Sequence, residues 1–450
     1  MYTRALNEWK EFVRIPSVSS GSVYRSHLFD CADWLAKHLQ KMGMQRVLQL
    51  TSGVAPPVVY AEEMIDTAKA TLLIYGHYDV QPADPLNEWK TPPFEPTVRG
   101  DYLYGRGVSD DKGQLFLHLK AVESLMAEHR LPINIKCLFE GEEEIGSTHL
   151  SNVLRTHKAL FKADCAVVSD MRMLDLHQPA LTYGLRGNIH AELLVTRQGT
   201  DLHSGIYGGI ASNPIHGLAH IIAKLHTTKG QIALPCFYDD VFKISTAERT
   251  YMRKNGPSNA QLRREMQGHD DIGEENFTAY EQLTIRPSLT VTGISGGYQG
   301  EGSKGVIPRQ ARAKLNFRLV PHQDSNQIAQ SLSRYVAQQC PSRLRVEVSV
   351  TAQSNAYQVN PDERVFQAAS SACQNVFGRK PVLLRSGGSI PIVSTLAEQL
   401  RLPVVMMGFA SPFDNLHAPN ERFYIPNFFR GVETSKQFIK NLEFMRHAYH

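Results

Sequence analysis

The sequence has little that would indicate a membrane-bound, secreted or disulfide-linked protein. No apolar run approaches the roughly 20 residues that cross a bilayer, and the amino-terminal segment lacks the unbroken apolar core of a signal peptide. The six cysteines are widely scattered and form no Cys-x-x-Cys pair. We therefore expect reduced cysteines, a cytoplasmic location and no association with membranes.

An excess of charge of one sign is also lacking. The 450 residues carry a formal net charge of +4, and they contain no basic run and no basic stripe interleaved with aromatic residues. This composition argues against nucleic acid as a partner. Apolar residues make up 42% and charged residues 20% of the chain, which is typical of a globular protein. The length predicts two domains.

The first part of the chain, residues 1–183, alternates between helical and strand patterns. Helices are expected at 24–43 and 112–130, and buried strands at 70–80, 133–139 and 164–170. This order predicts an α/β domain, with a mixed, largely parallel sheet flanked by helices. Residues 357–450 again alternate between helical and strand patterns and are expected to complete this domain.

The middle of the chain, residues 184–356, has a different pattern. Strands are expected at 187–198, 288–297, 311–321 and 344–353, and helices at 213–228 and 325–340. Four strands with two helices predict an inserted α+β domain of ferredoxin-like order. The polar, helix-prone stretch 246–280 is expected to extend this domain, and its pattern indicates no chemical role.

Polar side chains follow the expected strands of the first domain. They are His77 and Asp79 in GHYD, Asp110 and Asp111 in GRGVSDDKG, Glu140 to Glu144 in EGEEEIGS, Asp170 in VVSD, and His417 in HAPNE. Each alone has an ordinary explanation, as a structural histidine, a helix N-cap or a solvated face. In open α/β sheets, however, ligands collect at the carboxyl ends of the strands. We therefore expect these side chains to converge on one crevice.

Such a cluster requires a counter-charge, since buried like charges are costly and no Lys or Arg is expected to neutralise them. A divalent cation supplies it, and His with carboxylate ligands suits Zn²⁺ or Mn²⁺. The run of glutamates then has an explanation. Adjacent glutamates can point differently, one toward a metal and one toward a water molecule as a general base.

The motifs together resemble a known family of dinuclear metallopeptidases. It includes carnosinases, cytosolic non-specific dipeptidases, glutamate carboxypeptidases and acetylornithine deacetylases. The matching segments are GHYDVQP, GRGVSDDKG, EGEEEIGS, VVSD, ALTYGLRG, DLHSGIYGG, IPRQARAKLNFRLVP, RSGGSIP and HAPNE, in the family's order from residue 76 to residue 421. YDVQP and TYGLRGN favour the dipeptidase branch. The resemblance implies hydrolysis of dipeptides or short peptides.

The resemblance also implies a role for each site residue. Asp110 would bridge two divalent ions, Zn²⁺ before Mn²⁺ or Co²⁺, and the peptide bond from Asp110 to Asp111 would be cis. His77 and Asp170 would complete one metal site, and Glu144 and His417 the other. Asp79 would orient His77, and Glu143 would be the general base.

Further roles concern the substrate. Arg318, Ser389 and Gly388 would hold its terminal carboxylate. His203 would stabilise the oxyanion in the active site of a partner subunit, which implies a homodimer formed through the inserted domain. The alternatives are a loop histidine without a role and an ordinary strand-edge arginine.

Two departures from the family's pattern place carnosine itself in doubt as a substrate. The segment SNAYQVNP contains no histidine, and Gly305 stands where a threonine often precedes VIPR. Two other functions stay open. One is hydrolysis of N-acyl amino acids by the same metals and base. The other is metal binding without catalysis, which would be indicated by a different residue in place of Glu143 or by the loss of a metal ligand.

Overall fold

The computed structural model describes residues 2–266 and 274–443. The chain forms two compact units, each described here by itself. The first comprises Met1–Tyr183, Val359–Leu384 and Thr395–His450, and the second Gly184–Gln358 and Arg385–Ser394. Residues 385–394 thus join the second unit, although the sequence pattern assigns them to the end of the first domain.

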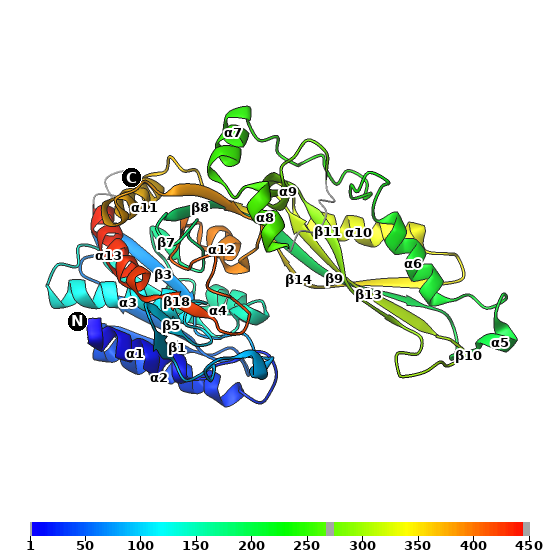
Figure 1. Ribbon diagram of the computed structural model, residues 1–450, viewed down its shortest axis with the longest axis horizontal. Coiled ribbons are helices and arrows are strands. Elements are labelled where there is room, and N and C mark those ends of the chain that lie inside the picture. The colour runs from blue at the N-terminus through cyan, green and yellow to red at the C-terminus, as the bar shows by residue number, and fades with distance from the viewer. Residues whose placement is uncertain (1, 267–273, 444–450) are drawn as a thin grey trace. The chain divides into compact units, whose positions relative to one another are not determined.

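Four parallel strands form the centre of the larger sheet (Figure 1). Its strands are β1 (Arg46–Leu50), β2 (Val58–Glu63), β6 (Asn134–Glu140), β3 (Thr71–His77), β7 (Cys165–Val168), β17 (Val404–Gly408), β8 (Ala180–Leu185) and β15 (Tyr357–Gln358) in this order, and β16 (Val382–Ser386) also pairs with β8. The neighbours β6, β3, β7 and β17 run parallel, whereas the remaining pairs along this order are antiparallel. This is the mixed, largely parallel sheet that the sequence predicts.

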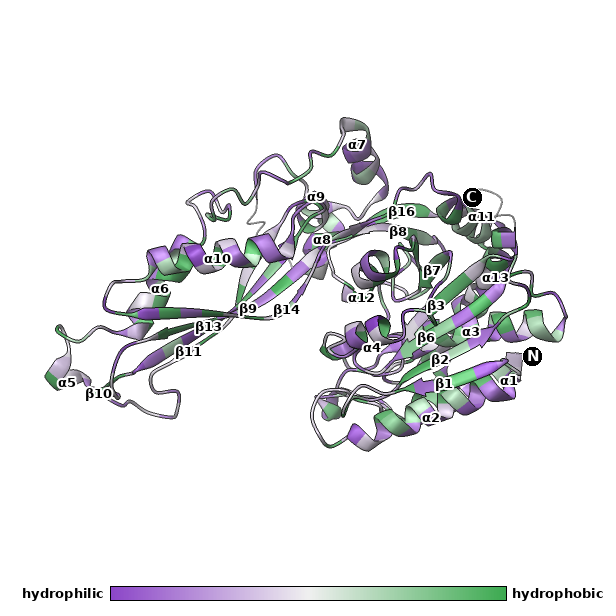
Figure 2. Cartoon of the chain, turned by 180° about the vertical axis from the view of Figure 1, so that it is seen from behind, coloured by the Kyte–Doolittle hydropathy of each residue, from purple (hydrophilic) through white to green (hydrophobic). Residues whose placement is uncertain are grey.

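The central strands are apolar on both faces because helices cover the sheet. β3 and β7 are mostly green in Figure 2, and six of the seven residues of β3 are buried. The helices of this unit are α1 (Tyr2–Arg14), α2 (Arg25–Lys41), α3 (Lys112–Ala127), α4 (Leu150–Thr156), α11 (Arg364–Phe377) and α13 (Ile425–Asn441). α3 packs between β3 and α13 and is buried on nearly every side.

Smaller elements complete this unit. A three-stranded sheet has the order β18 (Arg422–Tyr424), β5 (Tyr102–Tyr104) and β4 (Thr97–Arg99), and η1 (Leu86–Glu88) is a short 3₁₀ helix. The chain returns to this unit at the last residue of α12 (Pro391–Thr395), which continues into a π-helical turn at Leu396–Leu400. All six cysteines are free thiols. Among the helices of the described ranges, none is both long and apolar enough to cross a membrane.

The second unit contains a four-stranded antiparallel sheet with two helices on one face (Figure 1). The strand order is β11 (Ser288–Gly296), β13 (Gln310–Leu319), β9 (Gly187–Thr196) and β14 (Arg345–Ser354), and the helices are α6 (Pro214–Lys224) and α10 (Ser325–Gln339). Alternate residues of β9 and β13 are buried, and they form one core with apolar residues of the two helices. The predicted ferredoxin-like α+β domain is confirmed.

The polar stretch 246–280 lies within this second unit. It contains α7 (Thr246–Asn255), α8 (Asn259–Glu265) and the start of α9 (Ala279–Ile285), and its residues 267–273 lie outside the described ranges. The unit also contains a short two-stranded antiparallel sheet of β10 (Leu202–His203) and β12 (Val306–Ile307). α5 (Ser204–Tyr207) directly follows β10 in the chain.

Candidate metal centre

His77 is the last residue of β3, at the carboxyl edge of the sheet, in register with Glu140 at the end of β6. Asp111 Oδ2 accepts a hydrogen bond from the backbone N–H of His77 at 3.2 Å. A Cβ at the preceding residue, Gly76, would lie 2.9 Å from this oxygen and from Leu115. Glycine at 76 therefore lets β3 approach the start of α3 closely enough for this contact.

Asp110 lies in the loop between β5 and α3, and its peptide bond to the next residue is cis, as the resemblance implies. Glu421 is fully buried and anchors this loop. Its carboxylate accepts hydrogen bonds from the backbone N–H groups of Gly107, Ser109 and Asp110 at 2.9, 2.9 and 3.1 Å. Arg106 donates a further bond at 2.8 Å. The backbone that carries Asp110 is thus fixed by a neighbouring carboxylate.

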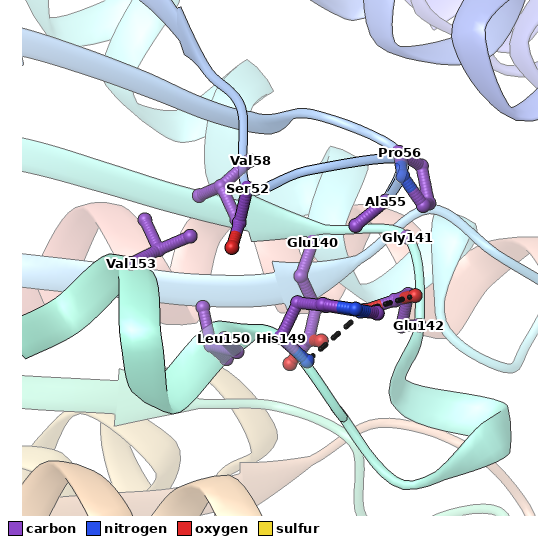
Figure 3. A pocket seen from close by; sticks show the side chains of 10 residues that line it. All are labelled: Ser52, Ala55, Pro56, Val58, Glu140, Gly141, Glu142, His149, Leu150 and Val153. Carbon is purple, nitrogen blue, oxygen red and sulfur yellow. Dashed lines mark hydrogen bonds and ion pairs between the residues drawn. The ribbon is translucent and has the colours of Figure 1, made fainter.

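Glu140, which ends β6, and Glu142 brace the turn that follows this strand. Glu140 accepts hydrogen bonds from Tyr75 at 2.7 Å and from Ser147 at 2.8 Å. Glu142 pairs with the His149 ring at 2.8 Å, and Figure 3 shows these two side chains side by side. Both glutamates are buried. Their contacts hold residues 140–149 in one conformation.

Asp79 connects this turn to His77. Its two carboxylate oxygens accept the backbone N–H groups of Glu143 at 3.1 Å and Glu144 at 3.0 Å, in the short 3₁₀ helix η2 (Glu143–Ile145). Asp79 Oδ1 also lies 3.3 Å from Nδ1 of His77. One carboxylate therefore aligns a histidine with two glutamates.

Two groups of ligand atoms share Asp110. His77, Asp110 and Asp170 bring one ligand atom each within 4.8 Å of one another, and Asp110, Glu144 and His417 do the same. Asp110 Oδ1 lies 3.2 Å from Nε2 of His77, and Oδ2 lies 2.9 Å from Nε2 of His417. Each oxygen of this carboxylate faces a different group, which is the arrangement of a bridging ligand.

The chemistry of these atoms fits divalent cations. Nε2 of His77 is buried without a hydrogen-bond partner in the described part of the chain. Within those residues, no Lys or Arg forms an ion pair with the carboxylates of either group. Lys112 is close in sequence, but its Nζ donates to the carbonyl oxygens of Phe12 and Ile15. Imidazole nitrogens and uncompensated carboxylates are the ligands of Zn²⁺ and Mn²⁺.

Glu143 lies beside the first group, with Oε2 4.0 Å from Nε2 of His77. Burial raises the pKa of Glu143 to about 8; the charge of His77 opposes this rise and that of Glu144 adds to it. Burial, reinforced by the charge of Asp110, raises the pKa of Asp170 well above its usual range. Both pKa values are raised because carboxylates lie close together away from water. A bound cation would offset this effect by supplying the opposite charge.

The second unit holds a different charged cluster. Arg318, on β13, donates a hydrogen bond to Ser389 Oγ at 2.8 Å. Arg186 is buried and donates to the carbonyl oxygen of Gly387 at 2.8 Å. Burial, with the charge of Arg318 adding to it, lowers the pKa of Arg186 to about 10. Within the described residues, neither arginine forms an ion pair with an acid. Two uncompensated guanidinium groups favour the binding of an anion.

His203 is exposed and lies on β10, at the end of the second unit away from α9 (Figure 1). Its Nδ1 accepts the backbone N–H of Gly205 at 3.1 Å. Asp201, two residues before His203, accepts a hydrogen bond from the backbone N–H of Arg309, which precedes the first residue of β13. Arg318 lies near the other end of β13. At about 3.4 Å per residue, β13 separates these two regions by roughly 27 Å. The structure therefore does not bring His203 and Arg318 of one chain together.

The sequence alone did not assign roles to Glu421 and Arg186. Both stand in segments that carry the resemblance, HAPNE and ALTYGLRG. The signal for Glu421 was an acid within the motif that supplies His417, but its three backbone partners lie more than 300 residues earlier in the chain. Such pairings depend on the fold and have no local pattern.

Comparison with known proteins agrees with this geometry. A family model described as peptidase family M20/M25/M40 matches residues 73–441. The chain is 31% identical to the Beta-Ala-His dipeptidase of Homo sapiens, with 97% of this chain and 89% of that protein covered. It is 30% identical to the Cys-Gly metallodipeptidase DUG1 of Saccharomyces cerevisiae, with 95% and 93% covered. The solved structure of the M20 family metallo-carboxypeptidase Sso-CP2 from Sulfolobus solfataricus matches with a TM-score of 0.89 and 31% identity, covering 98% of this chain and 99% of that one.

The chain belongs to peptidase family M20/M25/M40, since the family model covers most of its length. The resemblance inferred from the motifs is thereby confirmed, as is the fold class. The prediction of a metal-dependent peptidase is confirmed at this level, and the family's chemistry agrees with the two candidate ligand groups.

Proposed function

We propose that the protein hydrolyses the peptide bond of dipeptides that have a free terminal carboxylate, with two divalent ions per subunit. The observation that carries this proposal is the pair of ligand groups joined by Asp110, with the Glu143 carboxylate beside them. The similarity to two dipeptidases over nearly the whole chain supports the substrate class.

His77, Asp110 and Asp170 would hold one ion, and Asp110, Glu144 and His417 the other. Zn²⁺ is the first expectation, with Mn²⁺ and Co²⁺ as alternatives. When bound, the ions supply the Lewis acidity that polarises the scissile carbonyl and acidifies a water molecule. Asp79 keeps the His77 ring in position, because it lies against the ring nitrogen that faces away from Asp110.

Glu143 would act as the general base. It takes a proton from the attacking water and returns it to the nitrogen of the leaving amine, so that the carboxylate is regenerated in each turnover. Its backbone N–H is bonded to Asp79, which also lies against His77, so the backbone of Glu143 is held near this histidine. The positive charge of the ions would lower the raised pKa of Glu143 and favour its basic form.

Arg318, Ser389 and Gly388 would bind the substrate's terminal carboxylate. The 2.8 Å contact between Arg318 and Ser389 supports this role, because it brings a guanidinium and a hydroxyl to one place. The buried Arg186 adds a second positive charge without an acidic partner in the described residues. A carboxylate is the anion that a dipeptide supplies there.

His203 would act in the active site of a partner subunit, where it donates a hydrogen bond to the developing oxyanion. A dipeptide is far shorter than the roughly 27 Å of β13 that separate the regions of His203 and Arg318. Both residues can contact one substrate only if His203 comes from a second copy. We therefore propose a homodimer formed through the second unit.

The test of the proposed activity is hydrolysis by chelator-stripped protein, with Zn²⁺ and Mn²⁺ added back separately. The substrates are unblocked dipeptides, dipeptides amidated at the carboxyl terminus, and N-acetyl amino acids. Cleavage of unblocked dipeptides only after metal addition is the expected result. Cleavage of the acetylated compounds alone would assign the protein to N-acyl amino acid hydrolysis, and inactivity of the metal-loaded protein on every substrate would refute catalysis of this kind.

Subunit complementation tests the role of His203. We expect His203→Ala and Glu143→Gln homodimers each to be nearly inactive. When the two chains are co-expressed, a mixed dimer combines the Glu143 of one chain with the His203 of the other. Random pairing would then restore about a quarter of wild-type activity, because half the dimers are mixed and one of their two sites is complete. No recovery in dimers of verified mixed composition would show that His203 acts within its own chain.

A further inference from the structure

The helices α7 and α9 contact the loop that carries the proposed carboxylate-binding residues. We call Arg385–Ser389, which begins at the end of β16, the carboxylate loop. The hydroxyl of Tyr280, on α9, donates to the carbonyl oxygen of Arg385 at 3.0 Å and accepts the backbone N–H of Arg385 at 2.8 Å. Tyr280 is buried, so water does not compete for these bonds. One side chain therefore fixes both backbone groups at the base of the loop.

A second contact lies one turn further along α9. A Cβ built at Gly387 would be 2.6 Å from the carbonyl oxygen of Leu283. This spacing is closer than real side chains tolerate, so the loop backbone and the helix touch without an intervening side chain. α9 thus contacts the carboxylate loop at Arg385 and again at Gly387.

α9 is itself held firmly by buried charge. Glu281 is fully buried and closes a capping box with Thr278 at the start of the helix. Its carboxylate accepts hydrogen bonds from Arg249 at 2.8 and 3.1 Å and from Arg253 at 3.1 and 3.3 Å, both on α7. Glu248 of α7 also accepts two bonds from the Arg385 guanidinium, at 2.7 and 2.9 Å. Charged contacts therefore join α7, α9 and the base of the loop.

Arg186 holds the loop through other contacts. Its Nε donates to the carbonyl oxygen of Gly387 at 2.8 Å, and its backbone N–H donates to the carbonyl oxygen of Gly388 at 3.2 Å. The next residue, Ser389, contacts Arg318. The loop is thus fixed at consecutive residues up to the one proposed to contact substrate. An error in its position would be transmitted to the carboxylate-binding groups.

We propose that Tyr280 is a positioning residue for substrate binding, and that α7 and α9 serve to hold the carboxylate loop in its binding conformation. The inference rests on the proposed function, since it takes Arg318, Ser389 and Gly388 as the groups that bind the substrate carboxylate. It assigns a role to two helices of a polar region for which the sequence indicated none.

The test compares Tyr280→Phe with the wild type as metal-loaded full-length enzymes. Loss of the two hydrogen bonds is expected to raise KM for an unblocked dipeptide about tenfold and to change kcat by less than about twofold. For the same dipeptide amidated at its carboxyl terminus, KM should be nearly the same in both enzymes, because the carboxylate that the loop binds is missing. A purely structural role would instead lower the active fraction and leave KM for the unblocked dipeptide unchanged.

The matched control is Tyr335→Phe in the same unit. Tyr335 donates one hydrogen bond, at 2.8 Å, to the carbonyl oxygen of Lys224 and has no contact with the loop among the described residues. Its KM should equal that of the wild type. Gly387→Ala provides a second variant, because the added methyl group would displace the loop from Leu283. It should raise KM in the same way, even if Tyr280→Phe does not fold.

Hydrogen exchange of the loop amides gives a readout that does not depend on turnover. Exchange at Arg385 should be faster in Tyr280→Phe and unchanged in Tyr335→Phe. Equal KM values for the unblocked dipeptide, or equal exchange rates, in Tyr280→Phe and wild type would overturn the inference while the proposed activity stands. Failure of the wild type to cleave any dipeptide would refute the proposed function instead, and the exchange result would still decide whether Tyr280 positions the loop.

Discussion

Replacing Glu143 with glutamine is expected to lower kcat by about a thousandfold while both metal ions stay bound, since a general base contributes roughly 10²- to 10⁴-fold to such reactions. The substitution keeps the shape of the side chain and the backbone bond to Asp79, and it removes only the group that accepts the proton. Steady-state kinetics on an unblocked dipeptide, with metal content measured on the same sample, would check both parts of this expectation.

The neighbouring residue provides the control for this experiment. Glu142 lies in the same turn, but its carboxylate is bonded to His149. Glu142→Gln should therefore retain most of the wild-type kcat, with any loss expressed as lower thermal stability. Full activity of Glu143→Gln would disprove the assigned mechanism, and loss of metal from this variant would show that Glu143 is a ligand.

Replacing Asp110 with alanine is expected to release both ions and to lower kcat/KM by at least about a thousandfold. Asp110 presents one oxygen to each ligand group, so its loss weakens both sites at once. Elemental analysis of the purified protein would give the number of ions per chain. The expected change is from two ions to nearly none.

Asp170→Ala is the matched comparison, because Asp170 belongs to one ligand group only. This variant should keep about one ion per chain, in the site formed by Asp110, Glu144 and His417. If Asp110→Ala and Asp170→Ala lost the same single ion, Asp110 would not be a bridging ligand. The proposed dinuclear centre would then need a different shared residue.

The convergence of the candidate ligands could be predicted from the sequence because its signals are local. His77 ends a strand, Glu144 and Asp170 each follow one by a few residues, and β3, β6 and β7 are parallel neighbours in the sheet. Parallel neighbours must end at the same edge, so the order of the motifs already implied their convergence. The structure places Asp110 in both groups of candidate ligands, which agrees with the bridging role that the resemblance implies.

Other features could not be predicted because they depend on pairings between distant segments. The sequence pattern ended the inserted domain at residue 356, yet residues 385–394 belong to the second unit. The hydrogen bond from Arg186 to Gly387, 201 residues apart, is one of the contacts that hold them there. The proposed role of α7 and α9 could not be predicted for the same reason. The Tyr280 hydroxyl is hydrogen-bonded to the backbone of Arg385, 105 residues later in the chain.

The hydrogen bonds of Glu421 have a thermodynamic consequence for metal uptake. A site whose ligands must be ordered by the arriving ion loses affinity to conformational entropy. Here the backbone amides of Gly107, Ser109 and Asp110 are hydrogen-bonded to a carboxylate from near the other end of the chain, so that entropy is already lost when the polypeptide folds. The loop that carries Asp110 would therefore be ordered before a cation arrives, and bound ions would exchange without the chain having to refold.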